Sequence, residues 1–88
     1  MATITETVGA REITHGNFKD HARITQCLKL IIDHEVTLRM QRQQPPLTYA
    51  QKESLDMIAH KIGRIIAGES SFTDHWIDIS GYAEIANK

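Results

Sequence analysis

The chain has 88 residues, so we expect one domain at most. Its formal net charge of −1 creates no field that would attract nucleic acid or an anionic membrane, and neither is expected as a partner. Cys27 is the only cysteine, which excludes an intrachain disulfide. The first ten residues have neither a basic start nor an apolar run, and no stretch has the length of a membrane span, so a cytoplasmic protein is expected.

The first expected helix follows an N-terminal arm. Residues 1–16 carry little pattern, and we expect a flexible arm there unless something holds it. Asn17 is a good N-cap, and the helix is predicted to run to about Arg42, ahead of the Pro45-Pro46 pair. Cys27, within the apolar stripe, is expected to be buried and inert. The residues of this stripe recur at helical spacing: Phe18, Ile24, Cys27, Leu28, Ile31 and Leu38.

The second expected helix has the clearest pattern in the chain. Thr48 and Gln51 form a capping-box motif at its start. Gly68 is expected to end it in the left-handed conformation. Between them lies one apolar stripe, made of Leu55, Ile58, Ala59, Ile62, Ile65 and Ile66.

The third expected helix begins after a short loop at 69–72. Thr73 is predicted to cap it, with Asp74 in the first turn at the positive end of the helix dipole. Gly81 lies in mid-helix, where a close helix crossing or a nearby ligand would explain it. The core face is predicted to be Trp76, Ile79, Ala83 and Ala86.

These elements predict an all-α protein. Residues 17–88 form a single three-helix domain, and no strand or repeat is expected. So short a chain buries a small fraction of its surface, and association buries a second apolar face. We therefore expect a helical homo-oligomer.

Charged residues near the third helix are the first candidates for a site. Asp74 and Asp78 are four residues apart, so both carboxylates lie on one helix face and repel each other. A divalent cation would relieve that repulsion, as would Lys61 or Arg64 from the end of the second helix. The basic pair, beside a helix N-terminus, fits either a phosphate site or an ion pair with Asp74 and Asp78.

A second acidic pair, Glu53 and Asp56, begins the second helix. If the second and third helices are antiparallel, this pair lies at the opposite end from Asp74 and Asp78. This argues against a four-carboxylate metal site. The histidines lack zinc-ligand spacing, and no zinc is expected. His75, Trp76 and Tyr82 could contact a nucleotide base.

Two segments of the sequence resemble a phage and prophage family of unknown function. They are MIAHKIGR at 57–64, followed by Gly68, and DHWIDISGYA at 74–83. The family has a K-I-x-R helix, a glycine and a D-x-W-x-D-I-x-G-Y-A ending, and it is similar to phage nucleotide-modification-associated domains. The motif HGNF at 15–18 and Ile24 match its N-terminal part, so the resemblance covers most of residues 14–86.

More distantly, the chain resembles the MazG-type all-α NTP pyrophosphohydrolases. Those enzymes hold Mg²⁺ with an E-x-x-E pair on one helix and an E-x-x-D pair on the next. Asp78 matches the final aspartate of that pattern. Glu53 with Asp56 keeps an acidic pair but has aspartate second, and His75 stands where the pattern has glutamate. These departures weaken the case for a complete metal cage.

The resemblance implies two functions, and a purely structural oligomer is a third possibility. In the first, a phage-encoded protein in the host cytoplasm captures a nucleotide, or a nucleotide-derived immune signal, without hydrolysing it and without a cofactor. Lys61 and Arg64 would then hold phosphate, and Asp74 and Asp78 would orient the cations or the ribose. His75, Trp76 or Tyr82 would contact the base. In the second, a Mg²⁺-dependent pyrophosphohydrolase uses as metal ligands Glu53, Asp56, Asp74 and Asp78.

Overall fold

The computed structural model describes residues 12–88, and over this range all regular structure is helical, which confirms the all-α prediction. A helical turn at 12–15 precedes three helices, which are α2 (Phe18–Gln41), α3 (Tyr49–Ala67) and α4 (Thr73–Ala86). Eleven residues of the predicted arm, 1–11, lie outside the described residues. None of the described helices is long and apolar enough to cross a membrane.

Two of the three predicted helix starts are confirmed by their hydrogen bonds. The Asn17 side chain accepts a bond of 2.9 Å from the amide of Lys19, and α2 begins at the next residue after the cap. At α3, the Gln51 amide donates to the Thr48 hydroxyl, and the Thr48 amide donates to the Gln51 side chain, both at 3.0 Å. These reciprocal bonds satisfy amides that a helix leaves unpaired at its N-terminus.

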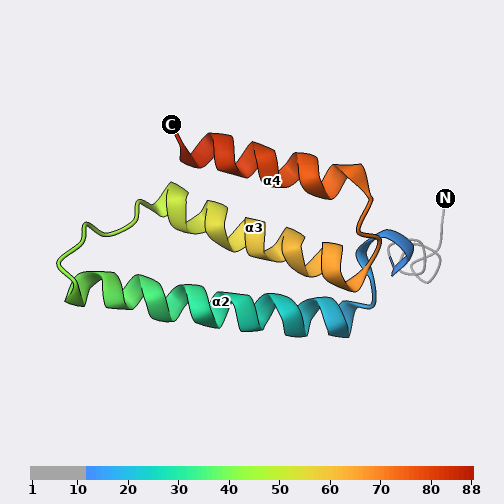
Figure 1. Ribbon diagram of the computed structural model, residues 1–88, viewed down its shortest axis with the longest axis horizontal. Helices are drawn as coiled ribbons and strands as arrows, with labels where there is room; N and C mark the ends of the chain where they lie inside the picture. The colour runs from blue at the N-terminus through green and yellow to red at the C-terminus, as the bar shows by residue number, and fades with distance from the viewer. Residues whose placement is uncertain (1–11) are drawn as a thin grey trace.

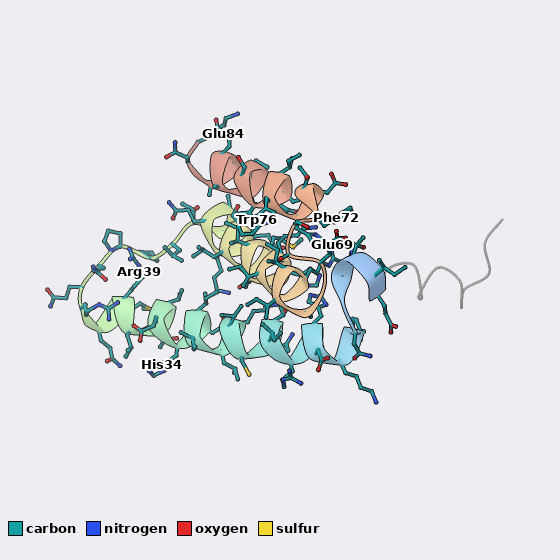
Figure 2. The ribbon with its side chains drawn as sticks, turned by 45° about the vertical axis from the view of Figure 1, so that its right-hand side comes forward. His34, Arg39, Glu69, Phe72, Trp76 and Glu84 are labelled. Atoms are coloured by element: carbon teal, nitrogen blue, oxygen red, sulfur yellow. The ribbon has the colours of Figure 1, made fainter. Side chains whose placement is uncertain are left out.

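The predicted cap of α4 was wrong by one residue. Thr73 is the first helical residue, and Phe72 occupies the cap position without a side-chain cap bond. The Phe72 ring instead packs edge-on against His75, with ring centroids 4.8 Å apart. Side-chain packing at this corner therefore determines the helix start in place of a polar cap. Figure 2 shows Phe72 and Glu69 at this corner, beside the N-terminal segment.

The three helices form a single layer with α3 in the middle (Figure 1). Each neighbour runs antiparallel to α3, and α3 packs against both. The outer helices α2 and α4 do not pack on each other. A layer one helix thick has two broad faces, and neither is covered by another element among the described residues.

Gly63 sets the distance between α2 and α3. A Cβ at this position would collide with the Thr25 hydroxyl and would lie 2.8 Å from Cδ2 of His21. Only a residue without a side chain lets the two backbones approach this closely at the crossing. Gly81 differs, since nothing lies within 4 Å of its would-be Cβ. Neither a helix crossing nor a close neighbour among residues 12–88 accounts for Gly81.

Gly68 ends α3, but the left-handed conformation predicted for it was wrong. Its φ is −117°, and its amide donates to the carbonyl of Arg64. The space around it explains the glycine, because a Cβ would lie 2.5 Å from the backbone of residues 14–16. The segment before α2 thus lies directly on the end of α3. It is held there by the carbonyl of Thr14, which accepts bonds of 3.1 Å from the amide of Glu69 and from Nε2 of His75.

The apolar stripes are less buried than the pattern predicted. Ala59, at 2% exposed, is the one buried hydrophobic residue among residues 12–88. Cys27 is exposed, against the expectation that it is buried. The layer covers only the edges of each helix. Further predicted core residues are therefore exposed as well, namely Phe18, Ile31, Leu55, Ile66, Trp76 and Ala83.

Replacement of the two helical glycines by alanine should have opposite effects. Gly63→Ala adds a methyl group at the crossing with Thr25 and should lower the free energy of unfolding by about 1–3 kcal/mol. Gly81→Ala meets open space and should raise it by about 0.5–1 kcal/mol through lower chain entropy. Urea unfolding at one fixed protein concentration measures both. Equal effects of the two changes would contradict the close approach at Gly63.

Candidate functional site

A pocket lies where the segment at 12–16, the start of α2 and the end of α3 meet. Its volume is about 410 Å³, which is within the range of small-molecule sites in proteins. A groove between the start of α3 and the end of α4 is slightly smaller, with a volume of about 380 Å³. Its walls are formed by Glu12, His15, Gly16, Phe18, His21, His60 and Arg64.

Four histidines gather in and beneath this pocket as two edge-to-face pairs. The rings of His21 and His60 have centroids 4.4 Å apart, and those of His15 and His75 have centroids 4.7 Å apart. His21 donates from Nε2 to the carbonyl of His60 at 3.2 Å, and His75 donates from Nε2 to the carbonyl of Thr14 at 3.1 Å. These bonds hold the His21 and His75 rings and tie α2 to α3 and α4 to the N-terminal segment.

The surroundings of His21 and His60 keep both imidazoles uncharged at neutral pH. Burial, followed by the nearby positive charge of Arg64, lowers the pKa of His60 to about 4. The pKa of His21 is also lowered, first by burial and then by Arg64, although its bond to the His60 carbonyl opposes this. The pocket therefore presents neutral aromatic rings beside one guanidinium group.

This combination suits a ligand that has both a flat ring and a negative charge. Phe18 is 72% exposed, and together with His15 it offers ring faces and edges for stacking. The Arg64 guanidinium can bind phosphate oxygens in a fork geometry. The Glu12 carboxylate, on the same wall, can accept hydrogen bonds from a sugar hydroxyl or an exocyclic amine.

Lys61, predicted as a phosphate ligand or an ion-pair partner, is paired with Asp78. Its Nζ lies 2.8 Å from Oδ2 of Asp78, and the Lys61 residue is buried between α3 and α4. The hydrogen bond from Lys61 lowers the pKa of the Asp78 carboxyl. Removal of either partner would leave the other without its counter-charge, so this pair serves the packing of α4 on α3.

The remaining candidates from the sequence lie in different places. Arg64 lines the pocket, and His75 lies beneath it, fully buried against His15. Trp76 is exposed, and its Nε1 donates to the carbonyl of Ser70 at 2.7 Å. Asp74 is exposed, and Tyr82 is half-buried further along α4. The structure therefore brings Arg64 and His75 to one site and leaves the other aromatic candidates outside the pocket wall.

The two acidic pairs do not converge within one chain. The groove between the start of α3 and the end of α4 is lined by Ser54 and Ala86, so Glu53 lies at the far end of α4 from Asp74. Asp56 binds Lys52 at 2.8 Å, and Lys52 also pairs with Asp33 of α2 at 2.8 Å. Residues 12–88 contain no group of three or more histidine, cysteine or acidic side chains arranged to hold a metal ion.

Sequence reasoning missed most of the pocket wall. His60 was not predicted as a site residue, and Phe18 was predicted to belong to the apolar stripe of the first helix. His15 and His21 come within reach of His60 only through tertiary contacts, namely the bonds of Thr14 and the close crossing at Gly63. The sequence did offer one signal, because a mid-helix glycine such as Gly63 indicates a close backbone approach.

Comparisons of the chain with protein-family models, with curated proteins and with solved structures found no match.

The neutral state of His60 predicts that the fold weakens in mild acid. An unfolded His60 takes up a proton near its ordinary value of 6.5, whereas the folded residue does so at about 4. Between these values the unfolded chain binds the extra proton, so the free energy of unfolding should fall as the pH falls from 6.5 to 4. His60→Gln should flatten this dependence, as measured by urea unfolding across the range.

The matched control is His34→Gln. His34 is exposed on α2 and projects away from the other helices (Figure 2), so this change should preserve the wild-type pH dependence. An NMR titration of the histidine ring protons gives a direct check. A His60 that titrates near 6.5 in the folded protein would contradict its burial in this cluster.

Proposed function

We propose that this protein captures a nucleotide, or a nucleotide-derived signal, in the pocket of His15, Phe18, His60 and Arg64 and does not hydrolyse it. The proposal includes a homo-oligomer, for the reason that a single layer of helices has too little core of its own. The resemblance of the sequence to a phage family suggests that the signal belongs to host defence and that the protein acts in the cytoplasm of an infected bacterium.

The observation that carries the proposal is the composition of this one pocket. A nucleotide has a flat base, a sugar with hydroxyl groups and a charged phosphate, and the wall offers a partner for each. Phe18 and the neutral imidazoles suit the base, Glu12 suits the hydroxyl groups, and Arg64 suits the phosphate. A bare phosphate would meet Glu12 without the compensating contacts of the base, so it should bind less well.

Capture is favoured over hydrolysis by the positions of the carboxylates. A MazG-type pyrophosphohydrolase needs acidic residues of two adjacent helices around Mg²⁺. Here Asp78 binds Lys61 and Asp56 binds Lys52, while Glu53 lies at the opposite end of α4 from Asp74. Each acid therefore serves an ion pair or a solvated surface within the chain. The proposal assigns no catalytic residue and needs no Mg²⁺.

The test is capture and release. The protein is incubated with a panel of mono-, di- and triphosphate and cyclic nucleotides, with and without Mg²⁺, and the bound fraction is released by heat and analysed. We expect at least one nucleotide to be depleted from solution and recovered intact. Recovery of monophosphate with pyrophosphate would support the enzyme instead, and no depletion of any nucleotide would contradict both functions.

A matched pair of arginine variants localises the site. Arg64→Ala should weaken binding by roughly 10- to 100-fold, as expected for loss of a charge-assisted hydrogen bond to phosphate. Arg23→Ala removes the same charge from the exposed face of α2, where Arg23 pairs with Asp20, and should leave binding unchanged. Isothermal titration with the captured nucleotide measures both. Equal losses in the two variants would indicate general electrostatics and would contradict a site in this pocket.

A further inference from the structure

One side of the helical layer is apolar on all three helices. On α3, Ser54 and Lys61 face α4, while Gly63 faces α2. The residue that follows an α4-facing position is rotated by about 100° and so points out of the layer. Along α3 these positions are occupied by Leu55, Ile62 and Ile66.

The same side of α4 and of α2 follows from symmetry. Two antiparallel neighbours are related by an approximate two-fold axis perpendicular to the layer. The same rotation about each helix axis, counted from the residues that contact the neighbour, therefore leads to the same face of the layer on both helices. On α4, His75, Asp78 and Tyr82 face inward, and the residues that follow them are Trp76, Ile79 and Ala83. On α2, Thr25 meets Gly63, so the residue before it and its repeats at intervals of seven point to this face.

The apolar face is thus defined by nine residues, which are Ile24, Ile31, Leu38, Leu55, Ile62, Ile66, Trp76, Ile79 and Ala83. An independent observation agrees with the assignment, because Leu55 and Ala83 line one groove between α3 and α4. The face is open to solvent in the single chain. Ile31 is 64% exposed, Ile66 is 65% exposed and Trp76 is 54% exposed.

The charge around the apolar face suits contact with an identical face. None of the nine residues is ionisable. Two carboxylates lie on the same side of α2 as Ile24 and Ile31, and both are paired within the chain, Asp20 with Arg23 at 2.9 Å and Glu35 with Arg42 at 3.6 Å. In a symmetric dimer, a charged group near the axis lies close to the same group of the second chain. Unpaired charges of one sign in the interface would therefore repel each other. This face avoids that penalty.

The size of the face also fits a dimer. Three helices about 9 Å apart and about 25 Å long present roughly 700 Å². A standard stable interface buries about 800 Å² on each partner. The apolar face therefore provides nearly the whole area that a stable dimer needs, with Trp76 as a large aromatic anchor.

We propose that the apolar face is the interface of a symmetric homodimer, in which two layers stack into a six-helix sandwich. A second copy is the natural occupant, because residues 12–88 contain one buried hydrophobic residue, Ala59, and a second layer would complete the core. The nucleotide pocket stays open in this dimer. Arg64 is two residues beyond Ile62, about 200° around α3, so it lies on the opposite side of the layer.

The test compares glutamate substitutions at matched exposure. Ile31→Glu and Ile66→Glu place a charge in the apolar face. Leu30→Glu on α2 and Ile77→Glu on α4 place one at residues that are 69% and 60% exposed but point away from the apolar face. Light scattering after gel filtration should give twice the chain mass for the wild type and for the two controls. The first two variants should fall to the mass of one chain or lose their helical circular dichroism.

Trp76 gives a readout that does not depend on whether a variant folds. It is the only tryptophan in the chain, and the interface would bury it. In the wild type, acrylamide quenching of its fluorescence should be weak at concentrations where the mass is dimeric and should increase on dilution. A wild type with the mass of one chain and an accessible Trp76 would overturn the proposal. So would a dimer that survives the face variants and is lost in Leu30→Glu or Ile77→Glu.

Discussion

The structure depends on the position of α3, which packs against α2 on one side and α4 on the other. The close crossing at Gly63 and the ion pair of Lys61 with Asp78 fix these two contacts. Because α2 and α4 do not pack on each other, the described chain forms a flat layer with no enclosed core. Such a layer leaves two broad faces, and α3 contributes side chains to both of them.

The two faces have different chemistry and therefore suit different tasks. One has apolar residues on all three helices, and its carboxylates Asp20 and Glu35 are paired within the chain, which suits association with its own copy. The other carries the pocket, where burial and Arg64 keep His60 neutral. Ile62 and Arg64 stand two residues apart on α3 and serve these opposite sides. A charge placed on the apolar face should therefore affect assembly without contacting the ligand site.

The sequence predicted local structure well because helix starts depend on neighbouring residues. The cap at Asn17 and the box of Thr48 with Gln51 are confirmed. Periodicity also located the apolar stripes, but it could not say what covers them. Cys27 and Trp76 were predicted to be buried and are exposed, because no helix among residues 12–88 covers them. The histidine pocket was missed because only tertiary contacts unite its residues, such as the bond between His21 and the His60 carbonyl, 39 positions apart.

We propose that two chains share one hydrophobic core. Thermal unfolding of the wild type as a function of protein concentration tests this most directly. A core that exists only in the dimer links folding to association, so the Tm should rise steadily as concentration increases over several orders of magnitude. Circular dichroism at micromolar and calorimetry at near-millimolar concentration cover that range. A Tm that stays constant across it would show that a single chain is stable on its own and would contradict the account.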